Sequence, residues 1–114
     1  NMFLENVEGR LNVSMSSGKA ELTEISELGF FLCGSGEVTA TNSGLGANTK
    51  FDLNTGTVSI QTKSKLEDYN YQFNIGNGKV TIGSTTSSND LHLQNGSDKT
   101  IIGQVGSGSL TIRN

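Results

Sequence analysis

Asp90 and His92 are the side chains in this sequence that come nearest to acid–base chemistry. They stand two residues apart, so on a β-strand their side chains share one face. With a serine nearby, such a pair is typical of a hydrolase triad, in which the histidine takes the proton of the nucleophile. However, His92 is the only histidine, and no Gly-x-Ser-x-Gly turn presents a nucleophile. The alternation predicts instead that Leu91 and Leu93 point inward and His92 faces water, so we expect no enzyme.

Cys33 is the only cysteine, which rules out a disulfide within the chain. A reactive thiol needs an electropositive setting with a histidine, and nothing in the sequence connects Cys33 to His92. Cys33 ends a short apolar run from Phe30 that lies between Gly29 and Gly34. We interpret this run as a buried strand and Cys33 as a small buried apolar residue.

Metal and cofactor motifs are also missing from the sequence. Asp52, Asp90 and Asp98 are isolated, and neither the calcium-binding nonapeptide of β-rolls nor an EF-hand loop occurs. The Gly-Asn-Gly and Gly-Ser-Gly stretches at 76–78 and 106–108 lack the helix and Lys-Ser/Thr of a phosphate loop, so they are interpreted as turns. We expect neither a catalytic residue nor a metal or cofactor.

Three aromatic residues alternate on one expected strand: Tyr69, Tyr71 and Phe73. Residues spaced in this way share a face, and an exposed aromatic face could stack against sugars. The same alternation is the pattern of a half-buried strand, which predicts that these rings pack in the core or at its rim.

Composition limits the partners of the chain. The 114 residues suffice for one domain, and Pro is absent while Gly, Ser, Thr and Asn are abundant, as suits turns and exposed strand positions. The net charge is −3 and the lysines are scattered among acids, which argues against nucleic acid. No apolar stretch is long enough to span a membrane. Because the chain opens on Asn1, we expect a trimmed N-terminus, and membrane attachment only through a segment outside this chain.

A five-residue phrase recurs and must organise these residues: Gly, any residue, Val or Leu, Ser or Thr, then an aliphatic residue. It starts at Gly36, Gly56, Gly78 and Gly108, with a looser copy at Gly9 and a degraded one at Gly18. A period near 20 residues predicts an all-β fold of the β-solenoid or β-helix kind, stacked from two-strand repeats. The single domain would cover 1–114, with clear repeats over 36–114 and weaker, capping coils over 1–35.

The repeats also predict details of packing. Val58, Val80 and Leu110 occupy equal places in the phrase, so we expect them on successive rungs of one inward ladder. The glycines would serve as corners with positive φ. An antiparallel meander or sandwich stays open as the alternative, because the Asn-Gly pairs at 77–78 and 95–96 favour hairpin turns.

The sequence also predicts the local structure of two further segments. The stretch from Lys19 to Leu28 has apolar residues at helical spacing, but its place in the repeat favours a strand. The polar stretch from Ser84 to Asp90 is predicted to be a protruding, mobile loop that could carry recognition.

The stretch from Phe51 to Ser84 and the ending Gly106 to Ile112 resemble a bacterial family of adhesin-like proteins of unknown function, related to the head domains of auto-transporter adhesins. The resemblance is clearest over the C-terminal two thirds and is weaker over residues 1 to 35. It implies an all-β repeat domain displayed outside the cytoplasm at the cell envelope, behind a membrane anchor. It carries over no site residue.

We therefore expect a non-enzymatic adhesin-like module that binds an unknown protein or glycan at the cell envelope. The alternative is a structural β-solenoid scaffold that self-associates or acts in envelope stress. A hydrolase is the third and most distant interpretation. A signal or membrane segment upstream of Asn1 would favour the first, and its absence the second.

Overall fold

The computed structural model describes residues 2–63 and 65–113, and the side chains of all of these except Met2 and residues 46–48. The fold is all-β, as the sequence predicts, and its one helical turn in the described part is the 3-10 turn η1 (Leu66–Asp68). The strands are β1 (Met2–Glu5), β2 (Arg10–Met15), β3 (Lys19–Thr23), β4 (Glu27–Cys33), β5 (Glu37–Ser43), β6 (Leu45–Leu53), β7 (Thr57–Thr62), β8 (Asn70–Ile75), β9 (Lys79–Ile82), β10 (Thr85–Ser87), β11 (Leu91–Leu93), β12 (Thr100–Val105) and β13 (Ser109–Arg113).

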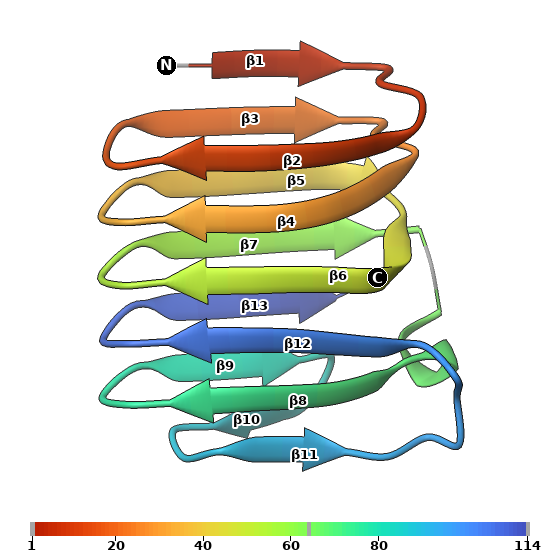
Figure 1. The fold of residues 1–114 in the computed structure, drawn as a ribbon, viewed down its shortest axis with the longest axis vertical. Helices are drawn as coiled ribbons and strands as arrows, with labels where there is room; N and C mark the ends of the chain where they lie inside the picture. The colour runs from red at the N-terminus through yellow and green to blue at the C-terminus, as the bar shows by residue number, and fades with distance from the viewer. Residues whose placement is uncertain (1, 64, 114) are drawn as a thin grey trace.

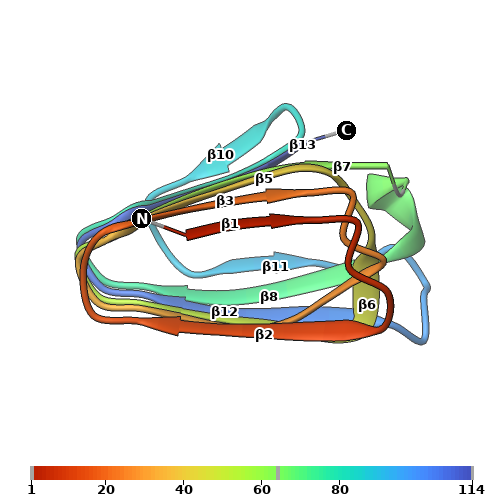
Figure 2. The same ribbon diagram turned by 90° about the horizontal axis from the view of Figure 1, so that it is seen from above.

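These strands form two sheets that face each other across the core (Figures 1 and 2). Sheet A has the order β1-β3-β5-β7-β13-β9-β10, and sheet B has the order β11-β8-β12-β6-β4-β2. From β2 to β9 the chain alternates between the sheets, so that each sheet-B strand and the following sheet-A strand make a two-strand unit. The period-two alternation of apolar residues lets each strand bury one face and expose the other. The segment from Lys19 to Leu28 joins this pattern as β3 and the start of β4, which confirms that it is strand and not helix.

The order of the units in space departs from their order in the sequence. The last unit, β12 and β13, lies between the unit of β6 and β7 and the unit of β8 and β9 (Figure 1). Val58, Leu110 and Val80 do lie on one inward ladder, because Leu110 is in register with both valines. All three are buried, but the C-terminal Leu110 stands between the other two.

Pairing is mixed, whereas the solenoid interpretation implies parallel units and its meander or sandwich alternative implies antiparallel pairs. β10 pairs with β9 and β11 pairs with β8, both antiparallel. The other pairings among the described residues are parallel. The predicted loop from Ser84 to Asp90 is therefore wrong in part, since Thr85–Ser87 forms the edge strand β10. Short antiparallel edges of this kind blunt the end of a stack against pairing with another chain.

The recurring glycines stack in a column at one corner. The predicted positive φ is confirmed for Gly9 and Gly18 and is wrong for the four clear copies, Gly36, Gly56, Gly78 and Gly108. Their role is close approach. The N–H of Ser109 donates to the carbonyl oxygen of Gly56, and a Cβ on Gly108 would overlap that same oxygen. A Cβ on Gly56 would stand 2.7 Å from the Gly36 carbonyl oxygen. Only glycine lets successive corners stack this closely.

The interior is a single apolar layer between the sheets. Its few buried polar groups are paired: the Thr49 hydroxyl donates to the Leu28 carbonyl and the Thr62 hydroxyl to the Ser43 carbonyl. Within the described part, no buried side-chain nitrogen or oxygen lacks a partner. The core thus follows the general rule that buried polar atoms are hydrogen-bonded.

Candidate functional site

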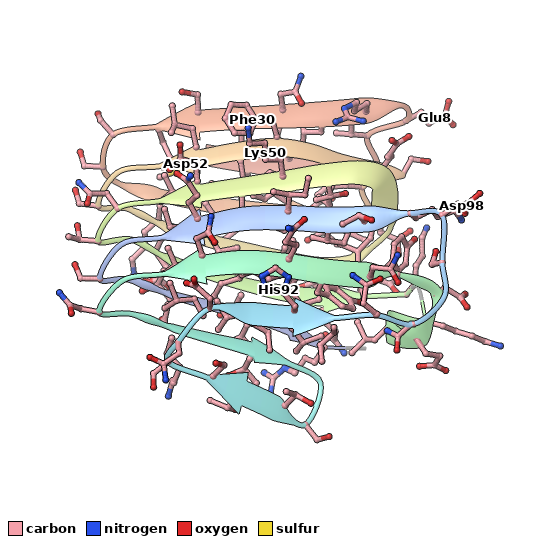
Figure 3. All side chains as sticks on the ribbon, turned by 60° about the horizontal axis from the view of Figure 1, so that its bottom comes forward. Glu8, Phe30, Lys50, Asp52, His92 and Asp98 are labelled. Atoms are coloured by element: carbon pink, nitrogen blue, oxygen red, sulfur yellow. The ribbon has the colours of Figure 1, made fainter. Side chains whose placement is uncertain are left out.

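The outer face of sheet B, called the sheet-B face below, carries side chains from β2, β4, β6, β8, β11 and β12. Strand register sets these side chains in two rows. The first runs His92, Gln72, Ile102, Lys50, Phe30, and the second runs Asn74, Gln104, Asp52, Leu32. Neighbouring positions in a row are one strand spacing apart, about 4.8 Å. The result is a regular grid of apolar, amide and charged groups (Figure 3).

Three large apolar side chains in this grid are open to solvent. Phe30 is 37% exposed, Leu32 40% and Ile102 45%. Lys50 places its Nζ 5.7 Å from the centre of the Phe30 ring, a cation–π contact. The predicted buried strand at residues 29–34 is therefore half right. Phe31 and Cys33 are buried, whereas strand alternation sends Phe30 and Leu32 outward.

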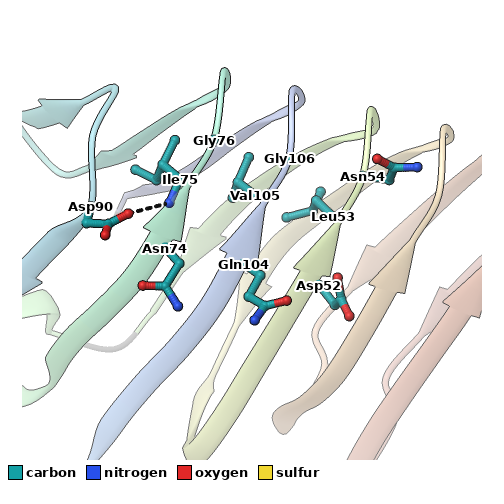
Figure 4. A pocket seen from close by; sticks show the side chains of 10 residues that line it. All are labelled: Asp52, Leu53, Asn54, Asn74, Ile75, Gly76, Asp90, Gln104, Val105 and Gly106. Atoms are coloured by element: carbon teal, nitrogen blue, oxygen red, sulfur yellow. Dashed lines mark hydrogen bonds between the residues drawn. The ribbon is translucent and has the colours of Figure 1, made fainter.

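A shallow trough of about 470 Å³ lies where the sheet-B strands run into their corner turns (Figure 4). Its polar lining is a series of carboxylates and amides: Asp90, Asn74, Gln104, Asp52 and Asn54. A second trough of about 360 Å³ shares Asp52 and Asn54 with it and continues along the corner to Ser14 and Ser16. Together they offer many hydrogen-bonding groups to an extended ligand and enclose none of it.

The residues suggested for hydrolase chemistry are not assembled into a triad. Asp90 uses its Oδ1 to accept the Ile75 N–H at 3.0 Å, which holds the start of β11 against the end of β8. His92 is exposed on the sheet-B face beside Gln72, while Leu91 is buried and Leu93 half-buried, as the alternation predicts. No hydrogen bond joins Asp90 to His92 among the contacts of the described residues.

Cys33 is buried on β4, and β6, β12 and β8 separate that strand from β11, which carries His92. Burial raises the pKa of the Cys33 thiol above its ordinary value, and a hydrogen bond with the Gly36 backbone offsets part of this effect. A thiol in this state is mostly protonated at neutral pH and is a poor nucleophile.

The aromatic series belongs to the core, as one of its two interpretations predicts. Tyr69, Tyr71 and Phe73 are all buried, and the Tyr71 hydroxyl donates to the Leu66 carbonyl at 2.8 Å. Burial most of all, and then the neighbouring Tyr69 and the acids Glu67 and Asp68, raise the pKa of Tyr71 well above its ordinary value. These rings are therefore not available to stack on a sugar.

Asp52 and Asp90 line the same trough, but Asp98 is not part of it. Within residues 2–63 and 65–113, no group of three or more His, Cys, Asp or Glu side chains is placed to hold a metal ion. No described helix is long and apolar enough to cross a membrane.

The outer face of sheet A differs in chemistry from the sheet-B face. Hydroxyl groups line up across its strands in register, in the row Thr39, Ser59, Thr111 and Thr81. A shallow hollow of about 210 Å³ beside this row is lined by Thr41, Gln61 and Arg113, among others. No large apolar side chain of β3, β5, β7, β9 or β13 is exposed there; Phe3 of β1, at the edge of the sheet, is 70% exposed.

The chain matches no family model, no curated protein and no solved structure. The exposed apolar residues of the sheet-B face are the feature that the sequence did not single out. For Phe30 and Leu32 the sequence did carry a signal, the run of four apolar residues at 30–33. Successive side chains of a strand point to opposite faces, so these four cannot all enter one core.

Proposed function

We propose that this chain is a non-enzymatic, adhesin-like binding module that docks an extended ligand on the sheet-B face. One observation carries the proposal. Of the four large apolar side chains exposed in the described part, Phe30, Leu32 and Ile102 all lie on this one face. Exposed apolar groups gathered on one surface and rimmed by polar groups mark interaction sites.

The geometry of the face favours an extended partner over a small molecule. Both corner troughs are open. In the larger one Asn74, Gln104 and Asp52 follow one another at strand spacing, so a polymer lying across the strands can make a similar contact several times. Each such contact is weak, and useful affinity would come from many contacts or from clustering of the domain. A protein or a glycan at the cell envelope is the partner that we propose, outside the cytoplasm. The envelope setting rests on the resemblance of the Phe51–Ser84 stretch and the ending.

We further propose that the architecture is a β-solenoid whose last unit is inserted between two earlier ones. The stacked units, the glycine column and the parallel register of most strands support this assignment. The two antiparallel edge strands would then serve as its cap at one end. A rigid scaffold of this kind holds its outer faces flat, which suits repeated contacts along a polymer.

The test is binding of the purified domain, free and clustered on beads, to arrays of glycans and envelope proteins. A triple variant, Phe30→Ala, Leu32→Ala and Ile102→Ala, should weaken capture at least about tenfold, because a few residues near the centre of an interface carry most of its binding energy. Gln61→Ala on the sheet-A face is the matched control and should bind like the parent. Equal binding by the triple variant would overturn the proposal. So would an esterase activity of the domain that His92→Ala abolishes.

A further inference from the structure

The inserted unit fills a slot that the rest of the chain leaves open. After β7 the chain does not continue to the neighbouring position but skips one unit before forming β8 and β9. The slot is bounded by β6 and β7 on one side and by β8 and β9 on the other. Only β12 and β13, the last strands, complete the two sheets between them (Figure 1).

The segment that fills the slot, β12 and β13, pairs in the described part of the chain only with the strands that border the slot. β12 pairs in parallel with residues 50–53 and 70–75, and β13 with residues 57–61 and 79–82. Four apolar side chains of the segment are buried in the core, with at most 2% exposure: Ile101, Val105, Leu110 and Ile112. The slot therefore recognises this segment through backbone pairing on both edges and through a set of buried anchors, independently of how the segment is connected.

The connection is short and polar. Residues 94–99 link β11 to β12, and Gly96 in this tether has a φ of +72°. The side chain of Asn70 holds the tether in place: its Oδ1 accepts the N–H of Asn95 at 2.8 Å, and its Nδ2 donates to the Ser97 carbonyl at 2.6 Å. Further hydrogen bonds run from the tether to the Tyr69 and Asp68 carbonyls, and the Lys99 Nζ lies 5.6 Å from the centre of the Tyr69 ring. These contacts are local to the tether and are separate from the strand pairings of β12 and β13.

We propose that the slot also binds the β12–β13 segment of a second copy of this chain, giving a reciprocal, two-fold dimer by exchange. An exchanged segment makes the same pairings and buries the same anchors as in the monomer, so the two states differ mainly in the tether and in the cost of association. The dimer is favoured at high protein concentration. It doubles the number of sheet-B faces on one particle, which raises the avidity of the binding module proposed above.

Neighbouring cysteines on the exposed sheet-B face test the exchange directly in the full chain. Lys50 of β6 and Ile102 of β12 are register partners, and both point to solvent. The chain carrying Lys50→Cys and Ile102→Cys is unfolded, refolded at low and at high concentration, separated by gel filtration and treated with a short thiol cross-linker. In an exchanged dimer this pair joins two different chains, so the dimer fraction should become covalent on a denaturing gel.

The matched control pair is Phe30→Cys and Lys50→Cys, which joins β4 to β6 of one chain in both states. It should give only cross-linked monomer from the same dimer fraction. If the 50/102 variant folds poorly, the register partners Asp52 and Gln104 replace it. The exchange is overturned if no dimer forms at high concentration, or if the dimer cross-links at 50/102 within single chains, since the copies would then meet through another surface. Either result would leave the proposed binding by the sheet-B face standing, because that binding is tested separately on the parent chain.

Discussion

Gly103 offers the sharpest test of the packing, because it sits between two aromatic rings inside the inserted unit. It is in register with Phe51 of β6 on one side and with Phe73 of β8 on the other. The two rings lean toward each other over this position, with centroids 6.5 Å apart and planes at 27°. A Cβ added at Gly103 would overlap the Cε1 and Cδ1 atoms of Phe73.

Replacing this glycine by alanine sets two effects against each other. Overpacking a well-filled core costs about 1–3 kcal/mol, while Gly→Ala gains about 0.4–1 kcal/mol by restricting the unfolded chain. We expect Gly103→Ala to lower the free energy of unfolding by about 1–2 kcal/mol, because the ring atoms leave no space. Urea denaturation should show a lower midpoint at unchanged slope. Ile102→Ala, the exposed neighbour, is the control and should cost under about 1 kcal/mol.

A second variant shows whether the Phe73 ring is the cause. In a Phe73→Leu background the obstacle is smaller, so Gly103→Ala should cost at least about 0.5 kcal/mol less than in the parent, as coupled neighbours do in a double-mutant cycle. A Gly103→Ala chain that is more stable than the parent, or one with the same loss in both backgrounds, would refute the ring contact.

Three further predictions concern the core. Ile60→Ala and Ile82→Ala should each lower the free energy of unfolding by about 2–5 kcal/mol and the exposed Thr57→Ala by under about 1 kcal/mol, and similar losses for all three in urea melts would contradict the assigned faces. Cys33 should react with a thiol reagent far more slowly in the folded protein than in urea, so equal rates would disprove its burial. Because the pKa of Tyr71 is raised in the folded protein, this tyrosine ionises first in the unfolded state as pH rises above about 10, so the free energy of unfolding should fall there. The fall should be weaker in Tyr71→Phe, and the same pH profile of stability in parent and variant would count against the raised pKa.

Local sequence rules predict the strands and their faces well. Alternation places Val58 and Ile60 inward and Thr57 outward, and repeat position decides correctly that Lys19–Thr23 is a strand. These features depend on neighbours along the chain, and that is the information a single sequence carries.

The order of the units is a different kind of property. Leu110 fits the ladder next to Val58 as well as it fits next to Val80, so the repeated phrase itself cannot tell which place it takes. The order follows from the skip after β7, and Asn70 holds the tether that leads into the inserted unit; both involve residues far apart in the sequence. The sequence does not predict the arrangement of the sheet-B face for the same reason. Ile102 lies in one row with Lys50 and Phe30 only because β12 is inserted beside β6.

The place of β12 and β13 is the central claim, since the sheet-B face, the larger trough and the exchange all depend on it. Native-state hydrogen exchange of the amides of Leu110, Thr111 and Ile112 tests it most directly. A strand held between β7 and β9 should open only with global unfolding, so these amides should be as protected as those of Val58 and Ile60. Fast exchange of β13, like that of a frayed terminal strand, beside a protected β7 would contradict the insertion.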